Sequence, residues 1–273
     1  MIFKKNNPGC PCCNCPCACY KFEDNGNDSM GSHDLTATNA TYGTGKLDKA
    51  ATFTGTQYFE HDHDNCFVPG STGINVWFWI YREQPSTGAG GTNQIEYIVT
   101  KGLFPDQTVN HSSEPVNDGN FPGTWSVFID PKLQTTENTY DLSFAVAYEN
   151  GFVHDYTSAT TWENPAAWVF FFIWYEPTAG SAGTHTGRCS VIRNSTTVLD
   201  EVTVAIGDTE NPMRQTDNEK LYVGKHLGAT ESETIKIDNL GFCKDIGTKA
   251  EMTARAAALY NSGNGLACND SGK

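Results

Sequence analysis

The sequence predicts an all-β protein, a sandwich of two antiparallel sheets with one short helix near the C-terminal end. Three observations lead to this prediction. Runs of β-branched and aromatic residues follow one another along the chain, turn-forming Gly, Asn, Ser, Thr and Pro separate them, and no helical pattern lies between them. The absence of intervening helices excludes parallel βαβ units. A chain of 273 residues has a normal length for a single sandwich.

The expected strands are short. They cover residues 34–40, 48–54, 57–61, 74–82, 96–101, 125–130, 141–148, 167–175, 187–193, 197–205, 220–225 and 233–243. Two runs, 76–81 and 168–175, are apolar at consecutive positions, which is typical of a central strand that is covered on both faces. We expect the second sheet on one face, and loops, a subunit or a ligand on the other. Long polar segments, such as 103–124 and 149–166, are predicted to be loops.

One helix is predicted at residues 249–261. Thr248 and Glu251 have the spacing of a capping box, in which each side chain bonds the other residue's backbone N–H. The apolar residues that follow repeat on one helical face, and Gly263 is a stop signal. We expect this helix to lie on the sandwich.

The charge balance excludes several partners. The chain has 18 Lys and Arg against 32 Asp and Glu, a formal charge of −14. Nucleic acid and anionic membranes are poor partners for it, because phosphate binding depends on Lys and Arg replacing counterions. No apolar run is long enough to span a membrane. No apolar segment follows the two lysines near Met1, so no signal peptide is predicted.

Cysteines are concentrated near the N-terminus. A cysteine-rich head, residues 1–20, contains Cys10, Cys12, Cys13, Cys15, Cys17 and Cys19. So short a segment cannot bury an apolar core, so cross-links or a metal must order it. We favour disulfides, within the chain or between chains; a thiolate cluster with zinc or another soft metal, and a flexible tail, are the alternatives. Further disulfides are predicted among Cys66, Cys189, Cys243 and Cys268, with the pairing open.

Several segments resemble one known family. They are FEDNGNDSMG (22–31), HDLTAT (33–38), GKL (45–47), AATFTG (50–55), INVWFWIY (74–81), IKIDNLGF (235–242) and LYNSG (259–263). In this order they resemble laminin-G-like domains of the concanavalin-A-like jelly-roll fold, over residues 20–263. The resemblance implies two antiparallel sheets and mostly non-catalytic binding of glycans or proteins. It divides the chain into the head, a sandwich at 21–263 and a tail at 264–273.

The same resemblance implies a structural calcium ion. Asp238 matches the aspartate on the last strand of the family, and Asp28 or Asp24 matches the acidic opening loop. Calcium needs several oxygen ligands, which these carboxylates and nearby carbonyls could supply. The alternative is that Asp238 only hydrogen-bonds a turn.

The run Glu60-His61-Asp62-His63-Asp64 carries the residue types of catalysis. On a strand its three acids share one face, and paired carboxylates hydrolyse glycosidic bonds. The run is similar to the catalytic run of glycosidases on this fold, but its third acid is shorter and no Trp flanks it. A glycoside hydrolase is therefore a remote alternative. The two histidines could bind zinc, with a third ligand from elsewhere.

The sequence predicts a non-enzymatic protein. Its ligand loops would contain Trp125, Tyr156 and Trp162, which could stack on sugar rings unless they belong to the core. The favoured function is a structural or adhesion subunit of a virion or extracellular filament, linked through the head to copies of itself or to other subunits. A soluble, glycan-binding, lectin-like module is the alternative. Both functions predict an extracellular or virion-surface location.

Overall fold

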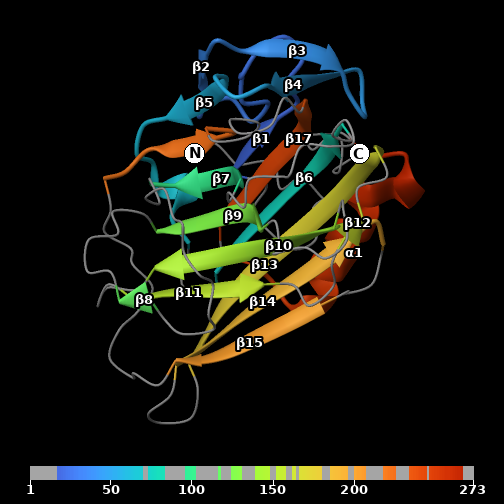
Figure 1. The fold of residues 1–273 in the computed structure, drawn as a ribbon. Helices are drawn as coiled ribbons and strands as arrows, with labels where there is room; N and C mark the ends of the chain where they lie inside the picture. Colours follow the sequence, from blue (N-terminus) through green and yellow to red (C-terminus); the bar gives the residue numbers. More distant parts are fainter. Residues whose placement is uncertain are drawn as a thin grey trace, which may run out of the picture.

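A computed structural model of the chain describes residues 17–69, 73–83, 96–102, 116–117, 124–130, 139–147, 152–157, 162–163, 166–179, 185–195, 200–206, 218–225, 234–244 and 246–266. Within these residues the molecule is a sandwich of two antiparallel sheets with one short α-helix (Figure 1), which confirms the predicted fold class.

Sheet A contains the longest strands. Its order is β15 (Asp200–Ile206), β14 (His185–Arg193), β13 (Trp168–Ala179), β6 (Ile74–Arg82), β17 (Ile235–Lys244), β4 (Lys49–Phe53) and β3 (Thr41–Thr44), and β1 (Ala18–Tyr20) also pairs with β17. Because β1 is part of this sheet, the sandwich begins before residue 21, the boundary expected from the sequence.

Sheet B lies in front of sheet A in Figure 1. Its order is β2 (Thr36–Thr38), β5 (Tyr58–His61), β16 (Leu221–Val223), β7 (Glu96–Lys101), β9 (Trp125–Asp130), β10 (Thr139–Ala147), β11 (Phe152–Thr157) and β8 (Val116–Asn117), and β12 (Trp162–Glu163) pairs with β10. Strands β11 and β12 lie where a loop at 149–166 was expected, so this expectation was wrong. The expected loop at 103–124 lies mostly outside the described residues.

The two aromatic strands at the centre of sheet A are buried on both faces, as predicted. Alternate residues of β6, such as Phe78, point into the core between the sheets, and those between them, such as Trp77, point to the outer face of sheet A. Residues of β13 divide in the same way, with Phe171 inward and Phe172 outward. Strand alternation therefore distributes one continuous apolar run over two separate clusters.

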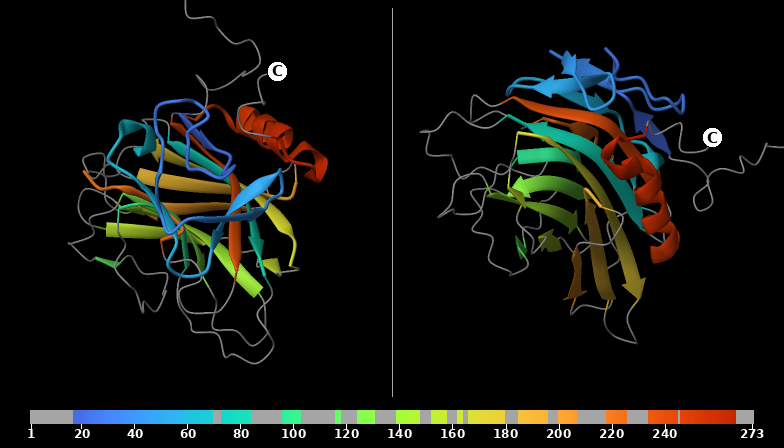
Figure 2. Two further views of the ribbon diagram at one scale, coloured as in Figure 1. Left: turned by 90° about the horizontal axis from the view of Figure 1, so that it is seen from above. Right: turned by 90° about the vertical axis from the view of Figure 1, so that its right-hand side faces the viewer.

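Helix α1 (Lys249–Tyr260) is the cover on the outer face of sheet A (Figure 2). Thr248 and Glu251 form both bonds of the predicted capping box, and Asn261 ends the helix in the left-handed conformation. Met252 and Leu259 pack on the outer aromatic cluster. From the sequence we expected loops, a subunit or a ligand to cover this face. A helix of the same chain covers it.

A glycine makes room for the aromatic cluster. Strand β17 has a bulge between Asp238 and Gly241. A Cβ on Gly241 would lie 2.0 Å from Cζ2 of Trp77, so the indole can lie across β17 only where a side chain is missing.

Candidate functional site

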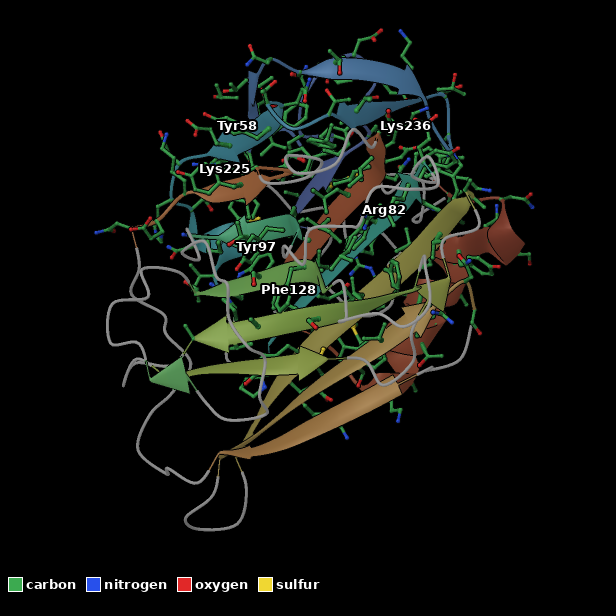
Figure 3. The ribbon with its side chains drawn as sticks, viewed as in Figure 1. Tyr58, Arg82, Tyr97, Phe128, Lys225 and Lys236 are labelled. Atoms are coloured by element: carbon green, nitrogen blue, oxygen red, sulfur yellow. A yellow bond between two sulfur atoms is a disulfide. The ribbon has the colours of Figure 1, made fainter. Side chains whose placement is uncertain are left out.

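The candidate site is a group of polar and aromatic side chains on the outer face of sheet B, near its β2 edge. We call Tyr58, Glu60, Lys220, Tyr222 and Lys225 the tyrosine–lysine patch. Glu60 on β5 and Tyr222 on β16 are paired across the strands, so they lie on the same face, and alternation places Tyr58 there as well. Figure 3 shows Tyr58 and Lys225 close together at this end of the sheet, with Tyr97 and Phe128 farther along it.

The two tyrosine rings and one lysine form the apolar part of the patch. The ring centroids of Tyr58 and Tyr222 are 6.3 Å apart in an edge-on arrangement. The ammonium of Lys225 lies 3.7 Å from the centroid of Tyr222 and 5.3 Å from that of Tyr58. Tyr222 is only 8% exposed, whereas Tyr58 is partly exposed, so Tyr58 offers the ring more open to a ligand.

The backbone at the end of β16 explains how Lys225 reaches these rings. Gly224 has a φ of 73°, in the left-handed region that favours glycine. A Cβ at this position would also lie 2.0 Å from Phe53 of the core. Glycine therefore lets the chain turn tightly at the end of the strand, which carries Lys225 back over the two tyrosines.

The charged part of the patch is an ion-paired triad. Lys220 Nζ lies 2.7 Å from Glu60 Oε1 and 3.2 Å from Asp62 Oδ1. The hydrogen bonds to Glu60 and then to Asp62 raise the pKa of Lys220 above its usual value. Burial, and secondarily the charge of Glu60, raise the pKa of Tyr222, so its hydroxyl stays protonated at neutral pH. The charge of Glu219 also acts on Tyr222, so two lysines face three carboxylates and this surface has no excess of positive charge.

The acidic run 60–64 does not continue as one strand. Strand β5 ends at His61, whose Nδ1 is 2.6 Å from the carbonyl oxygen of Asp62. Asp64 instead caps the short 3-10 helix η1 (Asn65–Phe67), accepting a bond from the backbone N–H of Cys66 at 2.7 Å. The regular alternation that a glycosidase-like run requires is therefore lost after His61.

The predicted zinc site of His61 and His63 gains no third ligand in the described part of the chain. His63 Nδ1 lies 3.2 Å from Nζ of Lys101, a fully buried lysine. Within the described residues, no group of three His, Cys, Asp or Glu side chains is arranged to hold a metal ion.

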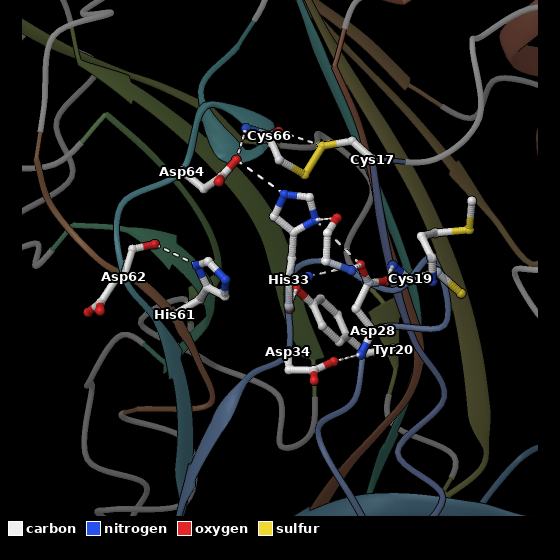
Figure 4. A network of polar contacts seen from close by, with 12 residues as sticks. Cys17, Cys19, Tyr20, Asp28, His33, Asp34, His61, Asp62, Asp64 and Cys66 are labelled. Atoms are coloured by element: carbon white, nitrogen blue, oxygen red, sulfur yellow. Dashed lines mark hydrogen bonds and ion pairs between the residues drawn. A yellow bond between two sulfur atoms is a disulfide. The ribbon is translucent and has the colours of Figure 1, made fainter. Parts of the chain in front are cut away.

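Asp28 is the centre of a polar network (Figure 4). Its Oδ1 accepts the backbone N–H of Cys19 and of Met30, both at 2.9 Å, and its Oδ2 accepts those of Ser32 and His33. The ring of His33 also lies between Asp28 and Asp64, at 3.4 and 3.2 Å. The carboxylate thus holds β1 and the segment after it in place.

The residues proposed for calcium do not fit that ion. Asp238, on β17, accepts the N–H of Leu47 at 2.8 Å and the side-chain amide of Asn239 at 2.6 Å. Burial raises the pKa of Asp238 to about 7, against the lowering effect of these bonds. The oxygens of Asp238 and of Asp28 face N–H donors, whereas calcium needs converging oxygen ligands. The carboxylate of Asp24 forms an ion pair with Lys49.

One disulfide joins the cysteine-rich head to the sandwich. Cys17 is bonded to Cys66, with 5.6 Å between the Cα atoms, and Cys19 is disulfide-bonded too. Cys189 and Cys243, two candidates for further disulfides, are instead buried thiols. The other predicted cross-linking residues, Cys10, Cys12, Cys13, Cys15 and Cys268, lie outside the described residues.

The residues expected in ligand loops, Trp125, Tyr156 and Trp162, all lie on strands. Trp125, on β9, is fully buried, and its indole N–H donates to the carbonyl oxygen of Phe67 at 2.8 Å. It is a core residue. Tyr156 lies on β11 opposite Phe144, and Trp162 on β12 opposite Tyr140.

Sequence reasoning missed the tyrosine–lysine patch. Its signals were present: Tyr58 and Glu60 alternate on one predicted strand, and the segment KLYVGK at 220–225 has two lysines around Tyr222. Nothing in the sequence indicated that these two segments, far apart along the chain, are neighbouring strands.

No helix in the described part of the chain is long and apolar enough to cross a membrane.

No protein-family model matches the chain, and no curated protein matches it either. Solved structures do resemble it. The binding domain of Paraclostridial Mosquitocidal Protein 1 has a TM-score of 0.59 at 10% identity, over 89% of this chain and 52% of that chain. The botulinum neurotoxin serotype D ligand-binding domain, solved in complex with N-acetylneuraminic acid, has a TM-score of 0.54 at 10% identity, over 88% and 50%.

A third similar structure is close in length. Domain 4 of AbnA, a GH43 extracellular arabinanase from Geobacillus stearothermophilus, was solved in complex with arabinotriose; it has a TM-score of 0.50 at 16% identity, over 88% of this chain and 97% of that domain. The chain spans about half the length of the two toxin domains. At these identities the likeness shows the fold, a β-sandwich found in binding domains; the laminin-G-like resemblance stays a prediction.

Proposed function

We propose that the protein is a non-catalytic carbohydrate-binding module that takes neutral glycans at the tyrosine–lysine patch. The observation that carries the proposal is the partly exposed ring of Tyr58 beside Lys225 and Glu60, on a face of sheet B that helix α1 does not cover. An aromatic ring with a few polar groups around it is the usual composition of a small-ligand site.

The chemistry of the patch suits a sugar. The C–H face of a pyranose or furanose ring can pack on Tyr58, because the aromatic ring is apolar with a negative face. Hydroxyls of the same sugar can accept hydrogen bonds from Lys225 and donate them to Glu60. The patch has no excess of positive charge and the chain as a whole carries −14, so an uncharged glycan is favoured over an acidic one.

The comparisons support this proposal at the level of the fold. Two of the similar domains were solved with a saccharide, arabinotriose or N-acetylneuraminic acid. The arrangement of acids also favours binding over hydrolysis, because the Glu60 carboxylate is held by Lys220 at 2.7 Å. Glycoside hydrolysis needs one of two paired acids to be protonated, and Lys220 forms ion pairs with both Glu60 and Asp62.

The experiment is a glycan array of neutral oligosaccharides, followed by titration of the best ligand against variants. Tyr58→Ala should weaken binding about tenfold, since an aromatic contact contributes about 1 kcal/mol beyond its buried area. Lys225→Met should weaken glycan binding several-fold.

The matched controls are Tyr81→Ala and Lys236→Met. These residues form another lysine–tyrosine pair, 5.4 Å apart, outside the patch. Equal binding by wild type and Tyr58→Ala, or equal losses in the controls, would refute the proposed site.

A second candidate is the surface-assembly subunit, a function favoured by the oxidised cysteines at the end of the head. Disulfides persist in oxidising, extracellular environments, so both candidates place the protein outside the cell. Light scattering on the full chain, with and without reductant, tests the assembly function. Assembly predicts a multimer that dissociates on reduction; a monomer in both conditions contradicts it.

A further inference from the structure

The buried face of helix α1 contains a cation. Arg255 is 9% exposed, and its neighbours on this face, Met252, Ala256 and Leu259, are apolar and buried. The guanidinium carbon lies 4.4 Å from the ring centroid of Trp77 in sheet A. Arg255 therefore points down onto the outer aromatic cluster rather than out to water.

The guanidinium has no acceptor. Nε, Nη1 and Nη2 of Arg255 are each buried without a hydrogen-bond partner among the described residues. Glu251, one helical turn earlier, uses its carboxylate to accept bonds from the backbone N–H and hydroxyl of Thr248. Leaving a buried charge unpaired is costly, and folded proteins rarely do so without a reason.

The sheet below supplies more unused donors. In the part of the chain that the structure describes, the indole N–H groups of Trp77 and Trp174 and the hydroxyl of Ser190 are buried without a hydrogen-bond partner. Trp174 is paired with Asn75 on one side and Ser190 on the other, so these side chains share one face of sheet A. Asn75 precedes Trp77 by two residues on β6, so Trp77 points to that same face.

These donors lie within one aromatic cluster. The ring centroids of Trp77 and Phe172 are 6.1 Å apart, and those of Phe172 and Trp174 are 6.0 Å apart. Arg255 rests on the first of these rings. Among the described residues of the cluster, two acceptors are unpaired, the amide oxygen of Asn75 and the hydroxyl of Ser190. The unpaired donors are more numerous, because the guanidinium and the two indoles can only donate.

We propose that helix α1 and sheet A bind the carboxylate of a small apolar acid at Arg255. A guanidinium pairs with a carboxylate through two parallel N–H bonds, and the indole N–H groups add further donors for the same oxygens. One cation balances one negative charge, and the surrounding rings favour an apolar body on the acid. This site lies on the opposite side of the sandwich from the tyrosine–lysine patch and is independent of the glycan proposal.

Burial has a kinetic consequence. A ligand under α1 can exchange only when the helix separates from the sheet, so binding and release should be slow. The Thr248 cap should control this rate, because its loss frays the first turn of α1.

Benzoate is the probe, with benzyl alcohol as its uncharged analogue and inorganic phosphate as a second anion. Benzoate should raise the Tm of the full chain and quench its tryptophan fluorescence, and benzyl alcohol should do neither. Arg255→Met should lose at least tenfold in affinity, and Trp174→Phe about tenfold, since hydrogen bonds to a charged group are stronger than those between neutral groups.

The matched control is Lys46→Met. Lys46 lies 4.7 Å from the ring of Trp79 on the same face, and the variant should bind benzoate as the wild type does. Arg255→Met should fold at least as well as wild type, because it removes an unpaired buried charge; if it does not fold, Trp174→Phe carries the test. The proposal is overturned if benzoate and benzyl alcohol act equally, if phosphate protects as well as benzoate, or if neither variant loses affinity.

Discussion

The outer faces of the two sheets start from similar strand sequences and end in different environments. Both carry aromatic residues that alternate with core residues. On sheet A, helix α1 covers Trp77, Phe172 and Trp174, which are at most 1% exposed. On sheet B, Tyr58 stays partly exposed at the edge, beside Glu60 and Lys225. The difference shows that an aromatic residue on a strand becomes core or exposed surface according to what covers it.

The charged side chains of the two faces differ in how much water they contact. At the partly exposed edge of sheet B, Lys220 and Glu60 pair in contact with water, where an ion pair contributes little to stability. Under the cover, Arg255 lies over the ring of Trp77 and has no hydrogen-bond partner among the described residues. Asp238, on the same face as Trp79, has likewise lost its hydration, and its pKa is raised to about 7. The charged groups of the covered face have therefore lost more hydration than those of the tyrosine–lysine patch.

The largest expected effect is a difference in stability when an aromatic side chain is truncated on each face. Phe172→Ala should lower the free energy of unfolding by about 3–5 kcal/mol, because a buried aromatic leaves a cavity. Tyr58→Ala should lower it by less than about 1 kcal/mol, since the ring is already in contact with water. Urea denaturation measures both. Similar losses in the two variants would mean that the faces do not differ as described.

The second prediction concerns pH. Asp238 has a folded-state pKa of about 7, above its usual 3.8, so the folded state binds the proton more tightly than the unfolded state. The resulting stabilisation is complete below about pH 4 and is lost as the pH rises through 7. Between pH 5 and 7.5, the free energy of unfolding should fall by about 2–3 kcal/mol.

Asp238→Asn should remove most of this pH dependence. Asp48→Asn, at an exposed position of the nearby β3–β4 turn, is the control and should keep it. If the Asp238→Asn variant keeps the wild-type profile, another group is responsible.

The third prediction concerns how helix α1 is held on sheet A. Thr248→Ala should cost about 1 kcal/mol, because it removes the side chain that accepts the N–H of Glu251. Thr253→Ala is the control within the same helix, since that hydroxyl only bonds the carbonyl of Lys249. Hydrogen exchange in α1 should accelerate in the first variant alone. An unchanged exchange rate would show that the cap does not hold the helix on the sheet.

The smallest expected effect is that of calcium. Since Asp28 and Asp238 accept N–H bonds, millimolar calcium should leave the Tm unchanged, compared with an equal concentration of magnesium. A calcium-specific rise in Tm that Asp238→Asn abolishes would restore the calcium prediction.

Much of the architecture could be predicted from the sequence, because it depends on local patterns. Every expected strand overlaps an observed one, and the helix was placed within one residue by its capping box. The strands that were missed, such as Thr41–Thr44 with its central glycine, and Phe152–Thr157 within a polar stretch, lack a clear apolar alternation. Their pairing partners, rather than their own residues, stabilise them.

The candidate sites could not be predicted in this way. Trp125 and Tyr58 are both aromatic residues on strands, yet one is buried core and the other surface. The patch combines residues of β5 and β16. These strands are far apart in the sequence, since Glu60 and Lys220, which bond each other, are separated by 160 residues. Cys66 was expected among the disulfides, but its partner proved to be Cys17 of the head.

Residue order alone thus specifies where strands, turns and the helix form, since periodicity and capping act over a few neighbouring residues. It also specifies that strands 74–82 and 168–175 need cover on both faces. Which surface helix α1 covers, and so which aromatics stay open and which charges lose water, is set by the packing of distant segments. Burial is a property of the folded chain, and it decides whether the same kind of side chain becomes part of the core or of the surface.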